Sequence, residues 1–200
     1  MLFTDLSIAA LLASTAAAVP FAGHDHSHRH LHRKQSNGNT FNINVVNSCS
    51  SSRSVGLFQI TSAFQMLSMS TPVTLQPGEN TTVAAPYQLA GMRLSGTADQ
   101  GTAAQWLPQA LFEFGYSAWG SVEGTAYDLS LMTGTTDGMS VVPANSNCES
   151  KSCSSPLDCP VSQAWTNPNQ DAIGSPADTT CYYGLTDFDV VFCPSSSSSY

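Results

Sequence analysis

The chain has 200 residues, and its 14 acidic residues outnumber its six basic ones, which gives a formal net charge of -8 at pH 7. Such a surface repels the phosphates of nucleic acids and anionic lipid headgroups, so both are excluded as partners. The length is sufficient for one domain with its own hydrophobic core.

The first 18 residues have the pattern of a secretory signal peptide. An apolar run from Leu6 to Ala13 is followed by the small residues Ala16 to Ala18, a typical cleavage site. The run is shorter than the ~20 apolar residues that span a bilayer, and no later segment is longer. We therefore predict an extracellular, secreted protein without a membrane span.

The pattern of residues 19–39 indicates a histidine-rich leader followed by a polar linker. Its histidines stand at every second position, so in an extended chain they face one side: His24, His26, His28, His30 and His32. Such tracts can hold Zn²⁺ or Cu²⁺ loosely, but a propeptide removed after the basic pair Arg33-Lys34 is the favoured interpretation. We therefore predict no metal and no cofactor for the mature protein.

Beyond the leader, short segments alternate apolar and polar residues, which is the period of half-buried strands. Clusters of Gly, Pro, Ser and Asn separate them, and no window has a sustained helical stripe. The predicted strands cover residues 41–47, 54–60, 80–84, 91–95, 109–116, 126–132, 139–142 and 187–193. This pattern predicts a mainly β fold, an antiparallel sandwich or barrel.

Six cysteines lie beyond the leader, and thiols in an oxidising compartment are normally paired. They are Cys49, Cys148, Cys153, Cys159, Cys181 and Cys193. Their spacing lacks the short pairs of structural zinc sites, so three disulfides are predicted. Sequence alone leaves the pairing open, although a bridge between the first and last cysteines would close nearly the whole domain. The other four would staple the loop-rich stretch between residues 147 and 184.

Two further features concern the surface and the end of the chain. Asn80-Thr81-Thr82 is an N-glycosylation acceptor beside a Pro-Gly-Glu turn, where a glycan would be exposed. The serine-rich residues 195–200 are low in complexity and are predicted to be disordered.

Three charged residues are predicted to face away from the core. Alternation within their strands places apolar neighbours on one face and Arg93, Glu113 and Asp128 on the other. One arginine and two carboxylates can therefore converge on one surface, if the strand order brings the three segments together.

The chain resembles the thaumatin-like proteins. The segment from Thr40 to Cys49 is similar to their first strand, residues 113–143 to their central segment, and Phe192-Cys193-Pro194 to their final cysteine. Within that superfamily, the six cysteines and the strand Tyr127-Asp128-Leu129-Ser130-Leu131 most resemble the small fungal branch of CetA-like and Blastomyces yeast-phase-specific proteins. The resemblance covers residues 40–194 as one domain and implies a β-sandwich with a disulfide-stapled loop region, in which Cys49 pairs with Cys193.

The resemblance also implies a candidate ligand site. In plant-type relatives, an acidic cleft of one arginine, one glutamate and several aspartates is associated with β-1,3-glucan binding. Glu113 and Asp128 stand where two of those carboxylates would fall, with Arg93 as the candidate arginine. The next aspartate is replaced near Thr133, and the cysteine-rich loop of the plant-type proteins is missing.

An enzymatic alternative assigns Glu113 and Asp128 as a catalytic pair. Glycoside hydrolysis needs one protonated carboxyl and one carboxylate, about 5–5.5 Å or about 6.5–9.5 Å apart. The opposing interpretation is that both are solvated strand residues or ion-pair partners of Arg93. No Ser-His-Asp or Cys-His site is available, because every histidine lies in the leader.

Aromatic side chains can add stacking platforms for sugars, with Trp119 as the first candidate. Most aromatic side chains belong to the core, but the loop-like surroundings of Trp119 and Trp165 raise their chance of exposure, and Trp106, Tyr182 and Tyr183 are further candidates. We assign Phe112, Phe114 and Tyr116 to the core.

The function predicted from the sequence is a secreted, non-catalytic and monomeric protein of the fungal cell wall or surface that binds β-glucan-type polysaccharide. A weak endo-β-1,3-glucanase with antifungal effect is one alternative. A surface adhesin or secreted effector that contacts host proteins is the other.

Overall fold

A computed structural model of the chain describes residues 40–132, 135 and 137–195. The predicted signal peptide (1–18), the histidine-rich leader (19–39) and all but the first residue of the serine tail lie outside the described residues, as does Thr133. Within the described part of the chain, no helix is long and apolar enough to cross a membrane.

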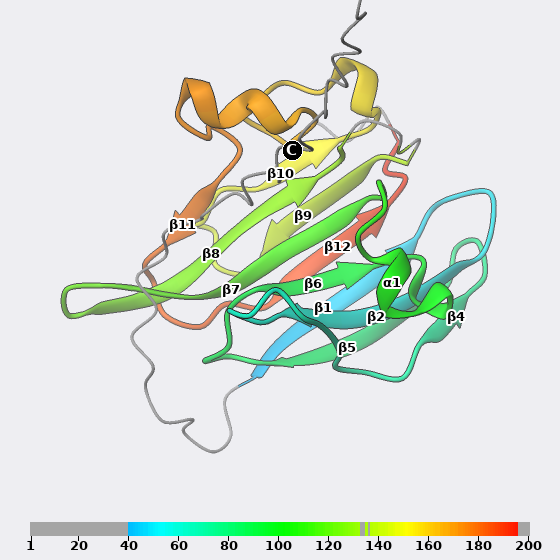
Figure 1. Ribbon diagram of the computed structural model, residues 1–200, viewed down its shortest axis with the longest axis horizontal. Helices are drawn as coiled ribbons and strands as arrows, with labels where there is room; N and C mark the ends of the chain where they lie inside the picture. The colour runs from blue at the N-terminus through cyan, green and yellow to red at the C-terminus, as the bar shows by residue number, and fades with distance from the viewer. Residues whose placement is uncertain (1–39, 133–134, 136, 196–200) are drawn as a thin grey trace, which may run out of the picture.

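The described strands form two sheets packed face to face (Figure 1). The five-stranded sheet has the order β10-β9-β12-β1-β5, with bounds β1 Thr40–Asn47, β5 Asn80–Pro86, β9 Met139–Pro143, β10 Lys151–Cys153 and β12 Phe188–Phe192. The other sheet has the order β11-β8-β7-β6-β2-β3, with β4 also paired to β2. Its bounds are β2 Arg53–Ile60, β3 Met66–Ser68, β4 Val73–Leu75, β6 Met92–Ser95, β7 Leu111–Trp119, β8 Val122–Ser130 and β11 Thr179–Cys181.

The mainly β fold predicted from the sequence is confirmed, and each predicted strand overlaps an observed one. The sequence pattern missed β3, β4, β10 and β11, which have three residues each and are too short to show a period. The pairing also differs in one place from a purely antiparallel sandwich, because β1 and β12 run parallel. The first and last strands of the domain are therefore neighbours.

Alternating burial along the strands builds the core between the two sheets. In β1, Phe41, Ile43 and Val45 are fully buried, whereas Asn42 faces outward. The rings of Phe41, Phe112, Phe114, Tyr127 and Phe188 form one aromatic cluster at its centre. Phe112 stacks on Phe114 at 4.8 Å between ring centroids and meets Phe188 edge-on at 5.0 Å. Tyr116 packs partly buried against this core.

The three predicted disulfides are present. Cys49 pairs with Cys193, as the resemblance implied, and joins the end of β1 to the end of β12. The other two pairs are Cys148 with Cys181 and Cys153 with Cys159. Both lie within residues 148–181, which we call the stapled end of the molecule.

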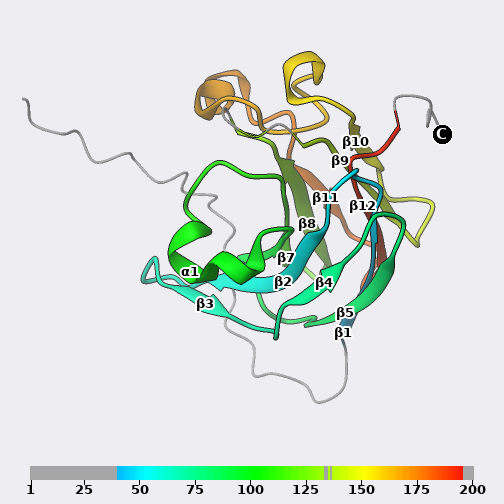
Figure 2. The same cartoon turned by 90° about the vertical axis from the view of Figure 1, so that its right-hand side faces the viewer.

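The stapled end caps one end of the sandwich, at the top of both views (Figures 1 and 2). It contains the short 3₁₀ helices η2 (Pro156–Asp158) and η3 (Pro168–Ile173). Gln170 holds it together: its Oε1 accepts hydrogen bonds from the backbone of Thr166 and Asn167, and its Nε2 donates to Ala164 O. Buried side chains here thus bond to loop backbone that no sheet pairs.

A second cover lies on the seven-stranded sheet. The 3₁₀ turn η1 (Ala98–Gln100) and the short helix α1 (Gly101–Ala104) connect β6 to β7 and lie beside β2 (Figure 2). Buried Gln105 and Gln109 fix this connection, because their Nε2 atoms donate to Gly101 O and Ala104 O. This connection thus covers part of the outer face of the seven-stranded sheet.

Candidate functional site

A row of charged side chains crosses the seven-stranded sheet on the face opposite the core. Arg93 on β6 lies opposite Glu113 on β7, and Glu113 lies opposite Asp128 on β8. Directly opposed residues of antiparallel strands have Cβ atoms about 4.5–5.5 Å apart. The register therefore brings the arginine and the two carboxylates together, an arrangement that the sequence could not establish without the strand order. We call these three residues the charged row.

Arg93 and Glu113 form an ion pair within the row. The Nε atom of Arg93 donates to Glu113 Oε1 at 2.6 Å, and its Nη1 donates to Gln105 O at 3.3 Å. The guanidinium also lies 5.7 Å from the ring centre of Trp106, a cation–π contact. Both members of the ion pair are mostly buried. Arg93 is therefore held in place from three sides and orients Glu113.

Asp128 is the unusual member of the charged row. Its Oδ1 atom is enclosed and has no hydrogen-bond partner among the described residues. Burial raises the pKa of Asp128 well above that of an ordinary carboxyl, and the charges of Glu113 and Asp178 raise it further. Arg93 and Lys151 oppose this shift. Asp128 is thus a carboxyl group that tends to keep its proton beside one that is ion-paired.

The structure adds an acidic residue that sequence reasoning missed. Asp178, just before β11, lies close enough to Asp128 to raise its pKa, and its Oδ1 accepts a 2.6 Å hydrogen bond from Trp165 Nε1. Trp165 and Asp178 both belong to the stapled end. It lies against β8 because the backbone of Trp165 pairs with Leu129 and Leu131, beside Asp128. No local pattern marks Asp178, since only the folded loop brings it to β8.

The aromatic candidates divide into exposed and buried residues. Trp119 is 73% exposed at the end of β7, and Trp106 is 51% exposed. Trp165, one of the candidates for an exposed ring, is only 3% exposed, and its backbone bridges to Ser130 at the end of β8. On β7, Trp119 has the same parity as Glu113, so both project from the outer face about 20 Å apart along the strand. The outer face of β6, β7 and β8 therefore carries the charged row and, at the end of β7, an exposed ring.

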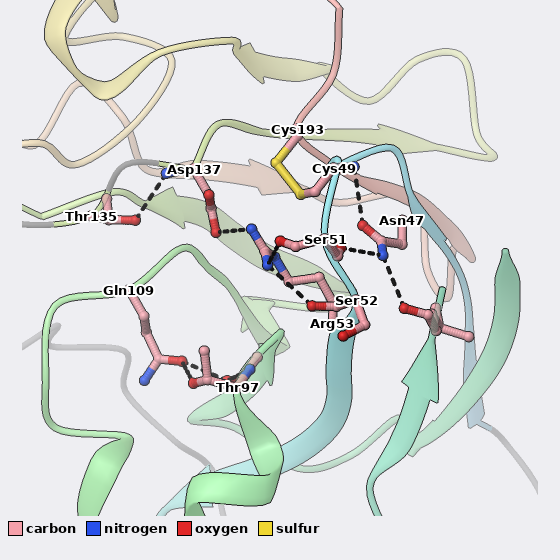
Figure 3. Close-up of polar contacts among 12 residues, drawn as sticks. Asn47, Cys49, Ser51, Ser52, Arg53, Thr97, Gln109, Thr135, Asp137 and Cys193 are labelled. Atoms are coloured by element: carbon pink, nitrogen blue, oxygen red, sulfur yellow. Dashed lines mark hydrogen bonds and ion pairs between the residues drawn. A yellow bond between two sulfur atoms is a disulfide. The ribbon is translucent and has the colours of Figure 1, made fainter. Parts of the chain in front are cut away.

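A second polar cluster lies where β2 begins, beside the Cys49–Cys193 disulfide (Figure 3). Arg53 Nη2 pairs with Asp137 Oδ2 at 2.7 Å, and its Nη1 donates to Ser51 Oγ and Ser52 O. Figure 3 shows Thr97 and Gln109 across from this pair, and a small pocket of about 160 Å³ lies between them. Sequence reasoning missed this ion pair because 84 residues separate its partners.

Every lysine and arginine of the described residues is ion-paired. Arg53 pairs with Asp137 and Arg93 with Glu113. Lys151 is fully buried and donates to Glu149 Oε1 at 3.0 Å. The same part of the chain carries twelve carboxylates against three basic side chains. Its surface therefore offers no unpaired lysine or arginine to an anionic ligand.

Potential metal ligands gather closely at one place only within the described ranges, at Cys49, Asp137 and Cys193. The two cysteines form a disulfide, so their sulfurs are not thiolates that could bind a metal ion. The carboxylates of the charged row do not form such a group. The histidines of the leader lie outside the described residues.

Comparison with known proteins finds likeness in structure only. No family model and no curated protein matches the sequence. The protein elicitor MoHrip2 from Magnaporthe oryzae is similar over 77% of this chain and 99% of its own, with 17% identity and a TM-score of 0.49. The thaumatin-like xylanase inhibitor TLXI is similar over 76% of this chain and 99% of its own, with 14% identity and a TM-score of 0.45. At these values the likeness carries no argument about function, and the site must be judged on its own geometry.

Proposed function

We propose that this protein is a secreted, non-catalytic protein of the fungal cell wall or surface that binds a neutral β-glucan-type polysaccharide at the charged row. It would belong to the small fungal thaumatin-like branch that its sequence resembles. The observation that carries the proposal is the row itself, with Arg93, Glu113 and Asp128 in register on one outward face and Trp119 on the same face.

The chemistry of the row suits a ligand rich in hydroxyl groups. A hydroxyl group both donates and accepts, so it can bond to carboxylate oxygens and to guanidinium N–H groups. The ion pair between Arg93 and Glu113 lowers the net charge of the surface, which favours a neutral ligand. An exposed indole ring adds an apolar face against which a sugar ring can pack. The pairing of all described cations argues against an acidic polysaccharide.

The proposal is tested by retention on insoluble β-1,3-glucan, with chitin and cellulose as comparison matrices. We expect selective retention of the secreted protein on β-1,3-glucan, reduced about tenfold in Glu113→Gln, because a charge-assisted hydrogen bond is lost. Trp119→Ala should weaken retention without changing the fold, since its side chain is exposed.

A matched control is available on the other sheet. Asp189 is an exposed carboxylate on β12 that accepts a hydrogen bond from Asn44 Nδ2 at 3.0 Å, so Asp189→Asn removes one charge far from the charged row. This variant should bind glucan as the native protein does. No retention of the native protein, or equal losses in Glu113→Gln and Asp189→Asn, would contradict the proposal and leave the host-contacting adhesin or effector to be pursued.

Weak endo-β-1,3-glucanase activity is a second candidate that one observation favours. A raised pKa at Asp128 beside the ion-paired Glu113 is the asymmetry that a general acid and its partner carboxylate need. The enclosure of Asp128 Oδ1 opposes it, because a general acid must reach the glycosidic oxygen. Release of reducing sugar from laminarin, abolished in Glu113→Gln and Asp128→Asn, would establish catalysis.

A further inference from the structure

A groove of about 370 Å³ lies at one end of the five-stranded sheet, on a different sheet from the charged row. It is formed where β1 begins, where β9 has ended and where the chain enters β12. The residues that line it are Asn42, Ala144, Asn145, Leu185, Thr186 and Asp187. Its volume is within the usual range of small-ligand sites.

The polar groups of this groove are held in place by hydrogen bonds. Asp187 Oδ1 accepts from Asn42 N at 2.8 Å and from Asn42 Nδ2 at 3.2 Å, so the carboxylate and the amide lie side by side. Across the groove, Asn145 Oδ1 accepts from Asn147 N at 3.0 Å, and Asn145 N donates to Thr186 Oγ1 at 3.1 Å. These bonds fix the side chains before any ligand arrives.

Two amide groups in the groove retain bonding capacity. Asn42 Oδ1 and Asn145 Nδ2 have no partner among the described residues, which leaves one acceptor and one donor beside the Asp187 carboxylate. A carboxylate accepts several hydrogen bonds, so neighbouring hydroxyl groups of a ligand can donate to Asp187 and accept from Asn145.

The loop between β11 and β12 gives the groove an apolar rim. Leu185 lines it directly, and Tyr183, two residues earlier in the same loop, is 60% exposed. The loop backbone is fixed, because Gly184 N donates to Glu123 O at 3.0 Å. Gly124 permits this approach, since any Cβ there would collide with the backbone of Cys181 and Tyr182. The exposed side chains thus sit on a rigid support.

The charge of the residues that line the groove limits which ligands it can bind. No lysine, arginine or histidine lines the groove, and its one ionisable group is the Asp187 carboxylate, so an anion is repelled. The remaining contacts are amides, small apolar groups and a nearby phenol, which suit a ring with hydroxyl groups on its rim and C–H groups on its face. We propose that the groove is a second binding site, specific for a neutral sugar unit and separate from the charged row.

The test is a titration of the ¹⁵N-labelled secreted protein with laminaritriose, mannotriose and chitotriose. At least one of these neutral sugars should shift the amide signals of Asn42, Asn145 and residues 185–187. Asn42→Ala and Asn145→Ala should each weaken that binding about tenfold, because each removes one hydrogen-bonding group. Asn44→Ala is the matched control, since the Asn44–Asp189 pair repeats the amide–carboxylate hydrogen bond two residues further along both segments, outside the groove.

Any of the following outcomes would overturn the inference. The first is that none of the three sugars shifts these signals. The second is that Asn44→Ala weakens binding as much as Asn42→Ala, or that trigalacturonate binds as well as the neutral sugars. The third is that Glu113→Gln abolishes the shifts, because the groove would then depend on the charged row. Shifts that persist in Glu113→Gln would support the groove even if the row proved not to bind glucan.

Discussion

The two packed sheets and the stapled end are held together by different forces. Between the sheets, the fully buried rings of Phe41 and Phe112 both contact Phe188, and backbone pairing satisfies the polar groups of the strands. In the stapled end, residues 148–181, two disulfides join irregular segments of the chain. The side chains of buried Lys151 and Gln170 donate hydrogen bonds to backbone carbonyl groups there. Paired strands satisfy their backbone N–H and C=O groups with one another. In an irregular loop, each buried backbone group needs another hydrogen-bond partner, such as a side chain.

This difference bears on the charged row, which lies where the two regions meet. The sheet alone sets Arg93 opposite Glu113, through the register of β6 and β7. The environment of Asp128 depends in addition on the stapled end, which supplies Trp165 and Asp178. The sheets therefore determine which side chains meet, and the stapled end determines how one of them titrates.

The largest effect is expected from a cavity at the centre of the sandwich. Phe112→Ala removes a fully buried ring that contacts Phe114 and Phe188, and should lower the free energy of unfolding by about 3–5 kcal/mol. Urea denaturation measures this change. Tyr183→Ala, which truncates an exposed ring, should cost less than about 0.5 kcal/mol. Similar losses in both variants would mean that the aromatic cluster does not dominate stability.

An effect of similar size but more local in extent is expected when the stapled end is opened. Replacing Cys148 and Cys181 by serine releases a loop with a sequence separation of 33, worth about 4 kcal/mol by loop entropy, against about 2 kcal/mol for the six-residue separation of Cys153 and Cys159. Hydrogen exchange should show lost protection at the Trp165 and Leu131 amides, while β1 and β12 stay protected. Equal loss throughout both sheets would show that the two regions do not unfold separately.

The smallest effect concerns the junction itself and depends on pH. Folding raises the pKa of Asp128 above its value of about 3.9 in an unfolded chain, so the folded protein binds the proton more tightly. Stability from this group is therefore present below about pH 4 and is lost as the pH rises through the raised pKa. Asp128→Asn should consequently be more stable than the native protein at pH 7, and this advantage should shrink towards pH 4.

Thermal unfolding of Asp128→Asn and of the native protein across this pH range measures the effect. Asp189→Asn, on the exposed face of the other sheet, is the charge-matched control and should follow the native curve. A pH dependence that is unchanged in Asp128→Asn would show that the enclosed carboxyl is not the group responsible.

Local sequence patterns determined much of this protein. Period-two alternation identified the long strands and the outward direction of Arg93, Glu113 and Asp128, because side-chain direction in a strand depends only on parity. The even number of cysteines in a chain with an apparent signal peptide predicted three disulfides. These features follow from neighbouring residues, so they can be predicted without the fold.

Tertiary structure alone decided which distant groups meet. The register of β6, β7 and β8 turned three outward side chains into one row, and the stapled end buried Trp165 and brought Asp178 to Asp128. The ion pair of Arg53 with Asp137 and the groove at Asn42 and Asp187 likewise join segments far apart in the chain. No local pattern specifies such contacts, because they depend on strand order and on the paths of loops, which long-range packing selects.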